Sequence, residues 1–164
     1  MKKIRVLIVD DHPIVRAGFR QILSETDDME VAGEAANGDD ALDCIRENQF
    51  DIVLLDISMP GRNGLEILRE LKKDAPGLPV LIMSMYPEEY YTARALQAGA
   101  SGYLTKAGAP NHLVLSIRKI LGDRPRPHLS VLAGKPLFHG RSWSFEHSIR
   151  SSPRAGEPHG QVRH

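Results

Sequence analysis

Apolar runs alternate with amphipathic stretches five times along residues 1–121. Most of the apolar runs are rich in Val, Ile and Leu, as strands are, and they cover 4–9, 30–36, 51–55, 79–84 and 102–105. The stretches that follow repeat apolar side chains at the 3.6-residue period of a helix, over 13–24, 39–47, 65–73, 88–98 and 110–121. Five strand–helix units of this length predict an α/β fold, with helices on both faces of a parallel sheet.

Turn-forming residues mark several of the boundaries between these elements. Pro13 suits the first turn of helix 13–24, and Pro110 opens the last helix in the same way. Asn37 forms a turn with Gly38, and Gly99 ends helix 88–98. No internal repeat interrupts the alternation, so residues 1–121 are expected to form one domain.

Polar residues follow four of the predicted strands, at the point where each strand ends. Asp10 and Asp11 follow the first strand, Asp56 the third, Ser84 ends the fourth and Lys106 follows the fifth. The carboxyl ends of parallel strands share one edge of a sheet, where open α/β folds bind ligands. Two like charges about 4 Å apart repel by roughly 4 kcal/mol at an effective dielectric constant near 20, so three carboxylates there need a counter-cation.

Each of these residues also has an ordinary structural explanation. An aspartate of the pair Asp10-Asp11 could cap helix 13–24, and Asp56 could be a turn residue. Lys106 could be a solvated lysine and Ser84 a strand-end hydroxyl. Only the joint occurrence of all five at strand ends favours a functional site, and Mg²⁺ is the expected ion because it prefers oxygen ligands.

The chemistry that fits this set is phosphoryl transfer to a carboxylate. Asp56 ends the central strand and is the candidate nucleophile and phosphoacceptor. Asp10 and Asp11 would hold Mg²⁺, while Lys106 and Ser84 would contact oxygens of the phosphoryl group.

At these residues the chain resembles the receiver domain of two-component response regulators, over residues 4–121. The matching motifs are Val9-Asp10-Asp11-His12, Leu55-Asp56-Ile57-Ser58-Met59-Pro60-Gly61, Ser84 and Gly102-Tyr103-Leu104-Thr105-Lys106. Their details, such as Asp11-His12-Pro13-Ile14-Val15-Arg16-Ala17-Gly18, are similar to the NarL/FixJ-type subfamily.

This resemblance implies a flavodoxin-like, doubly wound five-stranded parallel sheet of order 2-1-3-4-5 with five helices. It implies that a sensor histidine kinase phosphorylates Asp56, and that the Ser58 main-chain carbonyl joins Asp10, Asp11 and Asp56 as a Mg²⁺ ligand. The protein would catalyse only its own phosphorylation and dephosphorylation. It further implies a switch in which Ser84 and Tyr103 move and change the face formed by 88–98, 102–105 and 110–121, where a phosphorylation-dependent homodimer could form.

The residue after Lys106 departs from the family pattern. Many receivers have a proline there, often after a cis peptide bond, whereas this chain has Ala107. A cis bond before a residue other than proline costs about 2.5–4 kcal/mol, so a trans bond is expected.

Residues 122–164 differ in kind from the rest. They hold five prolines, five histidines and an excess of basic over acidic residues, without an apolar stripe of helical period. We expect a disordered or weakly structured tail, because few apolar groups are present to offset chain entropy. Members of the subfamily usually continue into a helix-turn-helix domain, so the tail predicts a transcription regulator with a truncated or out-of-frame C-terminus and no sequence-specific DNA binding.

The sequence leaves other functions open. A stand-alone receiver acting by protein contact, or as a sink for phosphate, is the main alternative. A haloacid-dehalogenase-like aspartyl phosphatase also uses an aspartyl nucleophile, but it has a second aspartate where this chain has Ser58. A flavodoxin-like mononucleotide binder would need a phosphate-cradling loop where this chain has Asp10 and Asp11.

Composition predicts where the protein works. No apolar run approaches the roughly 20 residues that span a bilayer, and the N-terminus lacks the pattern of a signal peptide, so we expect a cytoplasmic protein without membrane contact. The single cysteine, Cys44, fits a reducing compartment and is interpreted as a small apolar helix residue.

Overall fold

Strands and helices alternate along residues 2–122, the part of the chain that the computed structural model describes. The side chains of residues 88–90 also lie outside that description. The strands are β1 Ile4–Val9, β2 Met29–Ala35, β3 Ile52–Asp56, β4 Val80–Ser84 and β5 Gly102–Thr105. The helices are α1 Pro13–Ser24, α2 Gly38–Glu47, α3 Gly64–Asp74, α4 Glu88–Gln97, the short 3₁₀ helix η1 Lys106–Gly108, and α5 Ala109–Gly122.

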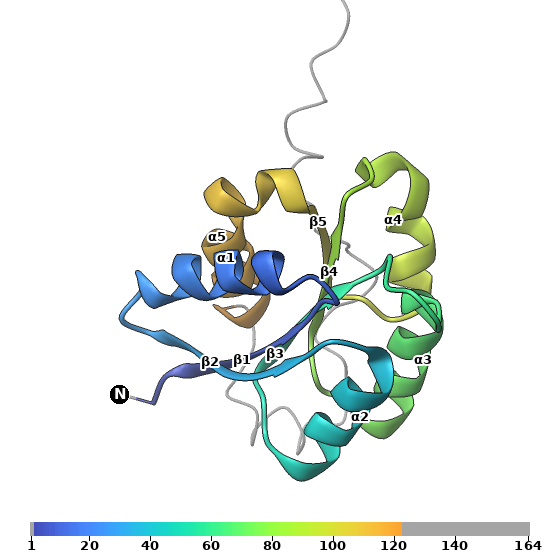
Figure 1. Ribbon diagram of the computed structural model, residues 1–164, viewed down its shortest axis with the longest axis horizontal. Helices are drawn as coiled ribbons and strands as arrows, with labels where there is room; N and C mark the ends of the chain where they lie inside the picture. Colours follow the sequence, from blue (N-terminus) through green and yellow to red (C-terminus); the bar gives the residue numbers. More distant parts are fainter. Residues whose placement is uncertain (1, 123–164) are drawn as a thin grey trace, which may run out of the picture.

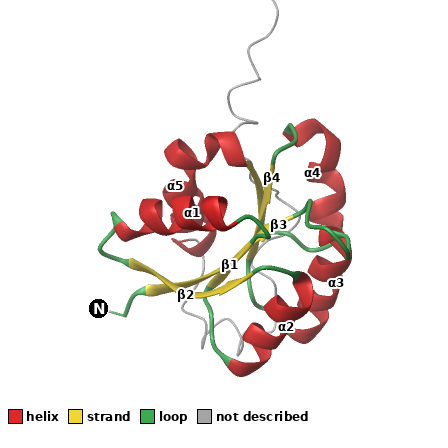
Figure 2. Ribbon diagram, viewed as in Figure 1, coloured by secondary structure: helices red, strands yellow, loops and turns green. Residues whose placement is uncertain are grey.

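The five strands form one parallel sheet in the order β2-β1-β3-β4-β5. Helices lie on both of its faces, with α1 and α5 on one side and α2, α3 and α4 on the other (Figure 1). Figure 2 shows the strands as the central layer between the two sets of helices. The flavodoxin-like, doubly wound fold predicted from the sequence is therefore confirmed.

Two apolar clusters fill the spaces between the sheet and its helices. On the side of α1 and α5, Phe19, Leu23, Leu113 and Ile117 pack among side chains of the strands. On the other side, the apolar face of α3 and residues Leu7 and Leu55 of the sheet belong to one buried cluster, to which α3 contributes Leu65, Ile67, Leu68 and Leu71. The sheet is thus covered on both faces, which explains why all five residues of β3 and all five of β4 are buried.

The start of the last helix differs slightly from the prediction. We expected the helix to open at Pro110, whereas α5 begins at Ala109 and η1 precedes it. The Thr105 hydroxyl accepts a hydrogen bond from the Gly108 amide at 3.2 Å and holds this tight turn. Proline has no amide hydrogen to donate, so Pro110 is tolerated within the first turn of α5.

The peptide bond before Ala107 is trans, as expected, because the described residues contain no cis peptide bond. Among those residues, no helix combines the length and the apolar character that crossing a membrane requires. The predicted tail, 122–164, lies outside the described residues apart from Gly122, which ends α5.

Candidate functional site

The carboxyl ends of β1, β3 and β5 bring three charged residues together. Asp10 and Asp56 are each 1% exposed, and Lys106 reaches both of them. The Lys106 Nζ atom lies 2.7 Å from Asp10 Oδ2 and 3.2 Å from Asp56 Oδ2. One ammonium group therefore bridges two buried carboxylates, which would otherwise repel each other in a poorly solvated edge of the sheet.

The acidic pair after β1 does not cap α1. His12 is the N-cap residue of this helix, without a capping hydrogen bond from its side chain, so the helix-cap interpretation of Asp10 and Asp11 is wrong. Instead, Asp10 Oδ1 accepts a hydrogen bond from the His12 amide at 2.9 Å, so the Asp10 side chain turns back towards the loop that follows β1. This leaves Asp10 Oδ2 facing Lys106.

Asp11 lies at the rim of the site, with 22% of its side chain exposed. The His12 Nδ1 atom lies 3.1 Å from Asp10 Oδ1 and 3.0 Å from Asp11 Oδ1. Ligand atoms of Asp10, Asp11, His12 and Asp56 all lie within 4.8 Å of one another. Three of these residues offer carboxylate oxygens, and Mg²⁺ is bound through one or two such groups, so the donor set fits this ion.

Asp56 carries an electrostatic cost in this position. Burial raises the pKa of its carboxyl group, while the Ser58 amide and the Lys106 ammonium act in the opposite direction. The amide donates to Asp56 Oδ1 at 3.0 Å. The raised pKa means that a further cation beside Asp56 would favour the ionised form that a nucleophile needs.

Ser84 and Tyr103 are joined through one residue of the loop between β4 and α4. The Tyr86 amide donates to Ser84 Oγ at 3.0 Å, and the Tyr103 hydroxyl donates to the Tyr86 carbonyl at 3.2 Å. Ser84 is 0% exposed and Tyr103 only 2% exposed. Tyr103 is therefore fully buried, and it belongs to the apolar cluster on the side of α2, α3 and α4.

Two residues at this edge were not recognised from the sequence. His12 contacts both carboxylates of the acidic pair, and Arg16 donates to the main-chain carbonyl of Asp10 at 2.6 Å. His12 directly follows the pair, a proximity that could have marked it. Arg16 had no such signal, because its contact depends on how α1 lies against the loop.

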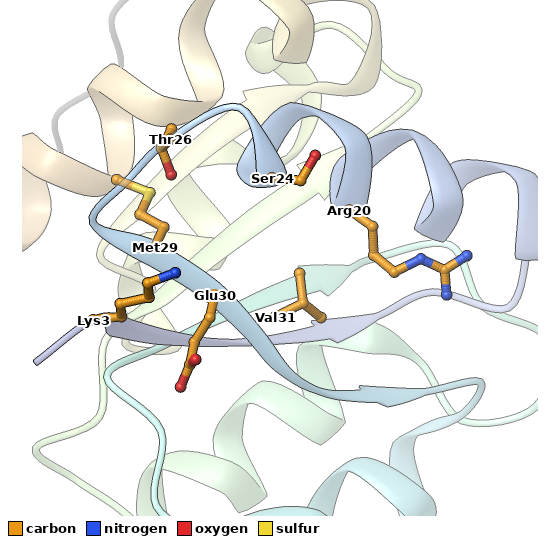
Figure 3. A pocket seen from close by; sticks show the side chains of 7 residues that line it. All are labelled: Lys3, Arg20, Ser24, Thr26, Met29, Glu30 and Val31. Atoms are coloured by element: carbon orange, nitrogen blue, oxygen red, sulfur yellow. The ribbon is translucent and has the colours of Figure 1, made fainter.

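A shallow hollow of about 360 Å³ lies elsewhere on the molecule (Figure 3). It lies between the C-terminal part of α1 and β2, and its lining includes Lys3 and Met29, at the amino ends of β1 and β2. Asp10, Asp11 and Asp56 lie at the opposite edge of the sheet, at the carboxyl ends of β1 and β3. The hollow is therefore separate from the charged site, and its lining contains no acidic cluster.

The family model for the response regulator receiver domain matches residues 6–118. The chain belongs to this family. Receiver domains bind Mg²⁺ at an acidic pocket, and in this receiver the aspartate cluster lies at the carboxyl edge of the sheet. The chain therefore belongs to two-component signal transduction. Response regulators in these systems work with sensor histidine kinases, and their receiver domains are generally not metabolic enzymes.

Curated relatives of this receiver are full response regulators. The chain is 43% identical over 117 residues to the response regulator UvrY of Escherichia coli, covering 71% of the chain and 54% of UvrY. It is 39% identical over 121 residues to the response regulator GacA of Pseudomonas aeruginosa, covering 74% of the chain and 56% of GacA. The chain thus spans about half the length of the curated relatives it matches.

Solved structures agree with this assignment. A two-component response regulator of the LuxR family from Aurantimonas superposes with a TM-score of 0.71 at 34% identity, covering 80% of this chain and 97% of that one. The response regulator domain of Thermotoga maritima CheB gives a TM-score of 0.69 at 30% identity, covering 76% of this chain and 100% of that one.

Proposed function

We propose that Asp56 is the phosphoacceptor of this receiver and takes a phosphoryl group from a histidine of a sensor kinase. The observation that carries the proposal is the pairing of a buried Asp56 with Lys106 at 3.2 Å and with the Ser58 amide at 3.0 Å. These contacts fix the carboxylate and place a cation beside it, as phosphoryl transfer requires.

The transfer would be a direct displacement at phosphorus. A carboxylate oxygen of Asp56 forms the new bond to phosphorus, the bond to the donor nitrogen breaks, and the electron pair stays on the departing imidazole, which takes up a proton. Lys106 would move from its contacts with the two carboxylates to a phosphoryl oxygen, which it can reach through its flexible stem. Ser84 would donate its hydroxyl to another oxygen.

Mg²⁺ would be held by the carboxylates of Asp10, Asp11 and Asp56 and by the Ser58 main-chain carbonyl. When bound, the ion supplies positive charge to the transferring oxygens. The fit rests on the carboxylate cluster, whose atoms lie close enough to serve one ion. The same charge would lower the cost of ionising the buried Asp56.

Phosphorylation would then switch the face formed by α4, β5 and α5. The contacts of Tyr86 with Ser84 and with Tyr103 support this, because a move of the Ser84 hydroxyl towards the phosphoryl group would break its bond to the Tyr86 amide. A phosphorylation-enhanced homodimer or partner complex through this face is the expected output.

For the whole chain, we take residues 1–121 as the receiver and 122–164 as a tail that adds no sequence-specific DNA binding. Regulation of transcription is our favoured role for this receiver, as its relatives UvrY and GacA suggest. A stand-alone receiver that acts by protein contact or as a phosphate sink is the alternative. The aspartyl phosphatase is disfavoured because Ser58 occupies the place of its second aspartate.

Replacing the nucleophile tests the proposal directly. We expect Asp56→Asn to abolish covalent labelling by radioactive acetyl phosphate in millimolar Mg²⁺, because an amide is not an effective nucleophile. Asp28→Asn is the matched control, since Asp28 is ion-paired to Arg118 and lies outside the site. Labelling of Asp56→Asn at the wild-type level, with the phosphoryl group on another residue, would contradict the assignment.

A further inference from the structure

Arg16 links the acidic loop to the edge of the sheet. Its Nη1 atom donates to the main-chain carbonyl of Asp10 at 2.6 Å, and its Nε atom lies 3.3 Å from Glu34 Oε1. The side chain is only 19% exposed. A guanidinium group has donors in a fixed fork, so the hydrogen bond to the Asp10 carbonyl is directional, and the ion pair with Glu34 holds the group beside β2.

Glu34 is itself held in place. Arg20, one turn further along α1, donates to Glu34 Oε2 at 2.7 Å, so the carboxylate lies between two guanidinium groups of the same helix. Glu34 belongs to β2, whose next residue, Ala35, accepts a hydrogen bond from the Asp10 amide at 3.0 Å. Glu34, which forms the ion pair with Arg16, therefore lies at the same carboxyl edge of the sheet as Asp10 and Asp11.

The carbonyl that Arg16 binds belongs to the peptide unit between Asp10 and Asp11. This unit is planar, so fixing the direction of its carbonyl also fixes the direction of the Asp11 amide. The plane lies one residue past the end of β1, beyond the last paired residues Val9 and Ala35 of the parallel ladder. Its orientation sets the backbone direction from which the Asp10 and Asp11 side chains leave, while the His12 amide and Lys106 hold the Asp10 carboxylate itself.

We propose that Arg16 is a positioning residue of the metal site, which sets the orientation of the Asp10-Asp11 peptide and so the affinity of the pair for Mg²⁺. The inference rests on the proposed function of Asp10 and Asp11 as metal-binding residues. Glu34 acts behind Arg16, and Arg20 supports Glu34 without touching the acidic loop. Groups that orient metal ligands are typically worth about 10–100-fold in metal affinity.

The test is a Mg²⁺ titration of the whole chain, with the dissociation constant taken from NMR amide shifts. We expect Arg16→Met to raise the dissociation constant about tenfold. Arg16→Lys should lose nearly as much affinity, since an ammonium on a flexible stem cannot fix the peptide plane as the fork does. Arg16→Lys with wild-type affinity would overturn the proposal, because positive charge alone would then be sufficient.

A kinetic measurement separates positioning from simple stabilisation. In the Arg16 variants, the Mg²⁺ concentration for half-maximal phosphorylation by acetyl phosphate should rise, while the rate at saturating Mg²⁺ stays within about twofold of wild type. Arg118→Met is the matched control, because it removes an ion pair with Asp28 away from the site and should leave the Mg²⁺ affinity unchanged. Lower thermal stability of Arg16→Met with unchanged Mg²⁺ affinity would overturn the positioning role.

Two further variants keep the outcome interpretable. Glu34→Gln retains Arg16 but weakens its anchor, and it should raise the dissociation constant roughly two- to fivefold even if Arg16→Met does not fold. Wild-type affinity of Glu34→Gln would contradict the supporting role of Glu34. Asp11→Asn tests the assumption that Asp10 and Asp11 bind Mg²⁺. If this variant binds Mg²⁺ as tightly as wild type, the assignment of the metal site fails, independently of the results for the Arg16 variants.

Discussion

Asp56 shows how a single buried carboxyl group sets the behaviour of the site. It is 1% exposed, and burial is the main cause of its raised pKa. The Ser58 amide and Lys106 reduce this cost without removing it. Asp56 is therefore a residue retained at the expense of stability, a pattern that fits a functional rather than a structural role.

Without metal, the stability of the protein should depend on pH through Asp56. The folded-state pKa of Asp56 lies above its ordinary value of 3.8, so between these two values the folded protein binds more protons than the unfolded chain. Stability due to this group therefore falls as the pH rises through that window. In EDTA, Asp56→Asn should unfold at a higher temperature than wild type at neutral pH, and this difference should shrink as the pH approaches 3.8.

Asp28 provides a control with the opposite sign. Its hydrogen bond to Arg118 lowers the pKa of the Asp28 carboxyl group, so the stability it contributes is present above 3.8 and is lost as the pH falls through the lowered value. Asp28→Asn should therefore be no more stable than wild type at neutral pH. Thermal unfolding followed by circular dichroism from pH 3 to pH 8 measures both effects, and an Asp56→Asn protein less stable than wild type at neutral pH would contradict the account.

Among the elements, the loop between β3 and α3 depends on a close backbone approach. Asn63 caps α3 by accepting a hydrogen bond from the Leu65 amide at 2.9 Å. Gly64 follows, and a Cβ atom there would lie 2.6 Å from Ile57 Cα and 2.8 Å from the Ile57 carbonyl oxygen. Ile57 directly follows Asp56, so the packing of this helix start is tied to the position of Asp56.

We expect Gly64→Ala to destabilise the protein by about 1–3 kcal/mol, because rigid backbone atoms must move to admit the methyl group. The same shift should slow phosphorylation of Asp56. Gly18→Ala is the matched control, since Gly18 is exposed within α1 and a Cβ atom there would meet nothing within 4 Å. It should gain about 0.5–1 kcal/mol through helix propensity.

Urea unfolding measures both glycine variants. The midpoint should fall for Gly64→Ala and rise for Gly18→Ala, with an unchanged slope in each case. A Gly64→Ala protein that unfolds at the wild-type midpoint would show that the loop admits the methyl group without a cost in stability. The proposed coupling between the start of α3 and the position of Asp56 would then be wrong.

At the scale of the whole molecule, one series of contacts connects the carboxyl edge to α4. Ser84 accepts from the Tyr86 amide, and the Tyr86 carbonyl accepts from Tyr103. The ring of Tyr86 also lies against that of Tyr91 on α4, with the ring centres 5.6 Å apart. Tyr86 is thus a point through which a movement of Ser84 can reach both β5 and α4.

Adding the phosphoryl mimic beryllofluoride with Mg²⁺ tests this connection. We expect NMR shifts at Tyr86, Tyr103 and along α4 as well as around Asp56, because loss of the bond from Tyr86 to Ser84 frees the loop. Ser84→Ala should reduce the distant shifts while the shifts near Asp56 persist. Shifts confined to the neighbourhood of Asp10, Asp11, Asp56 and Lys106 would rule the switch out.

Local patterns in the sequence were sufficient for the fold class, an α/β fold with a parallel sheet. Strands rich in Val, Ile and Leu alternate with amphipathic helices, and this order leaves few topologies open. The strand order 2-1-3-4-5 itself came from the family resemblance rather than from periodicity, because the pattern of one strand does not name its neighbours. The start of α5 was placed one residue late, since a proline marks a first turn without fixing which residue begins it.

The sequence by itself determined which residues end the strands, and a parallel sheet then requires Asp10, Asp56 and Lys106 to share an edge, because all its strands point the same way. Only the tertiary structure decided what those groups contact. The Lys106 bridge, the burial that raises the pKa of Asp56 and the approach of Arg16 to the Asp10 carbonyl depend on side-chain directions and on the lie of α1 against the sheet. The Lys106 bridge joins residues far apart along the chain, and the Arg16 contact depends on how α1 packs on the sheet, so no local pattern encodes either of them.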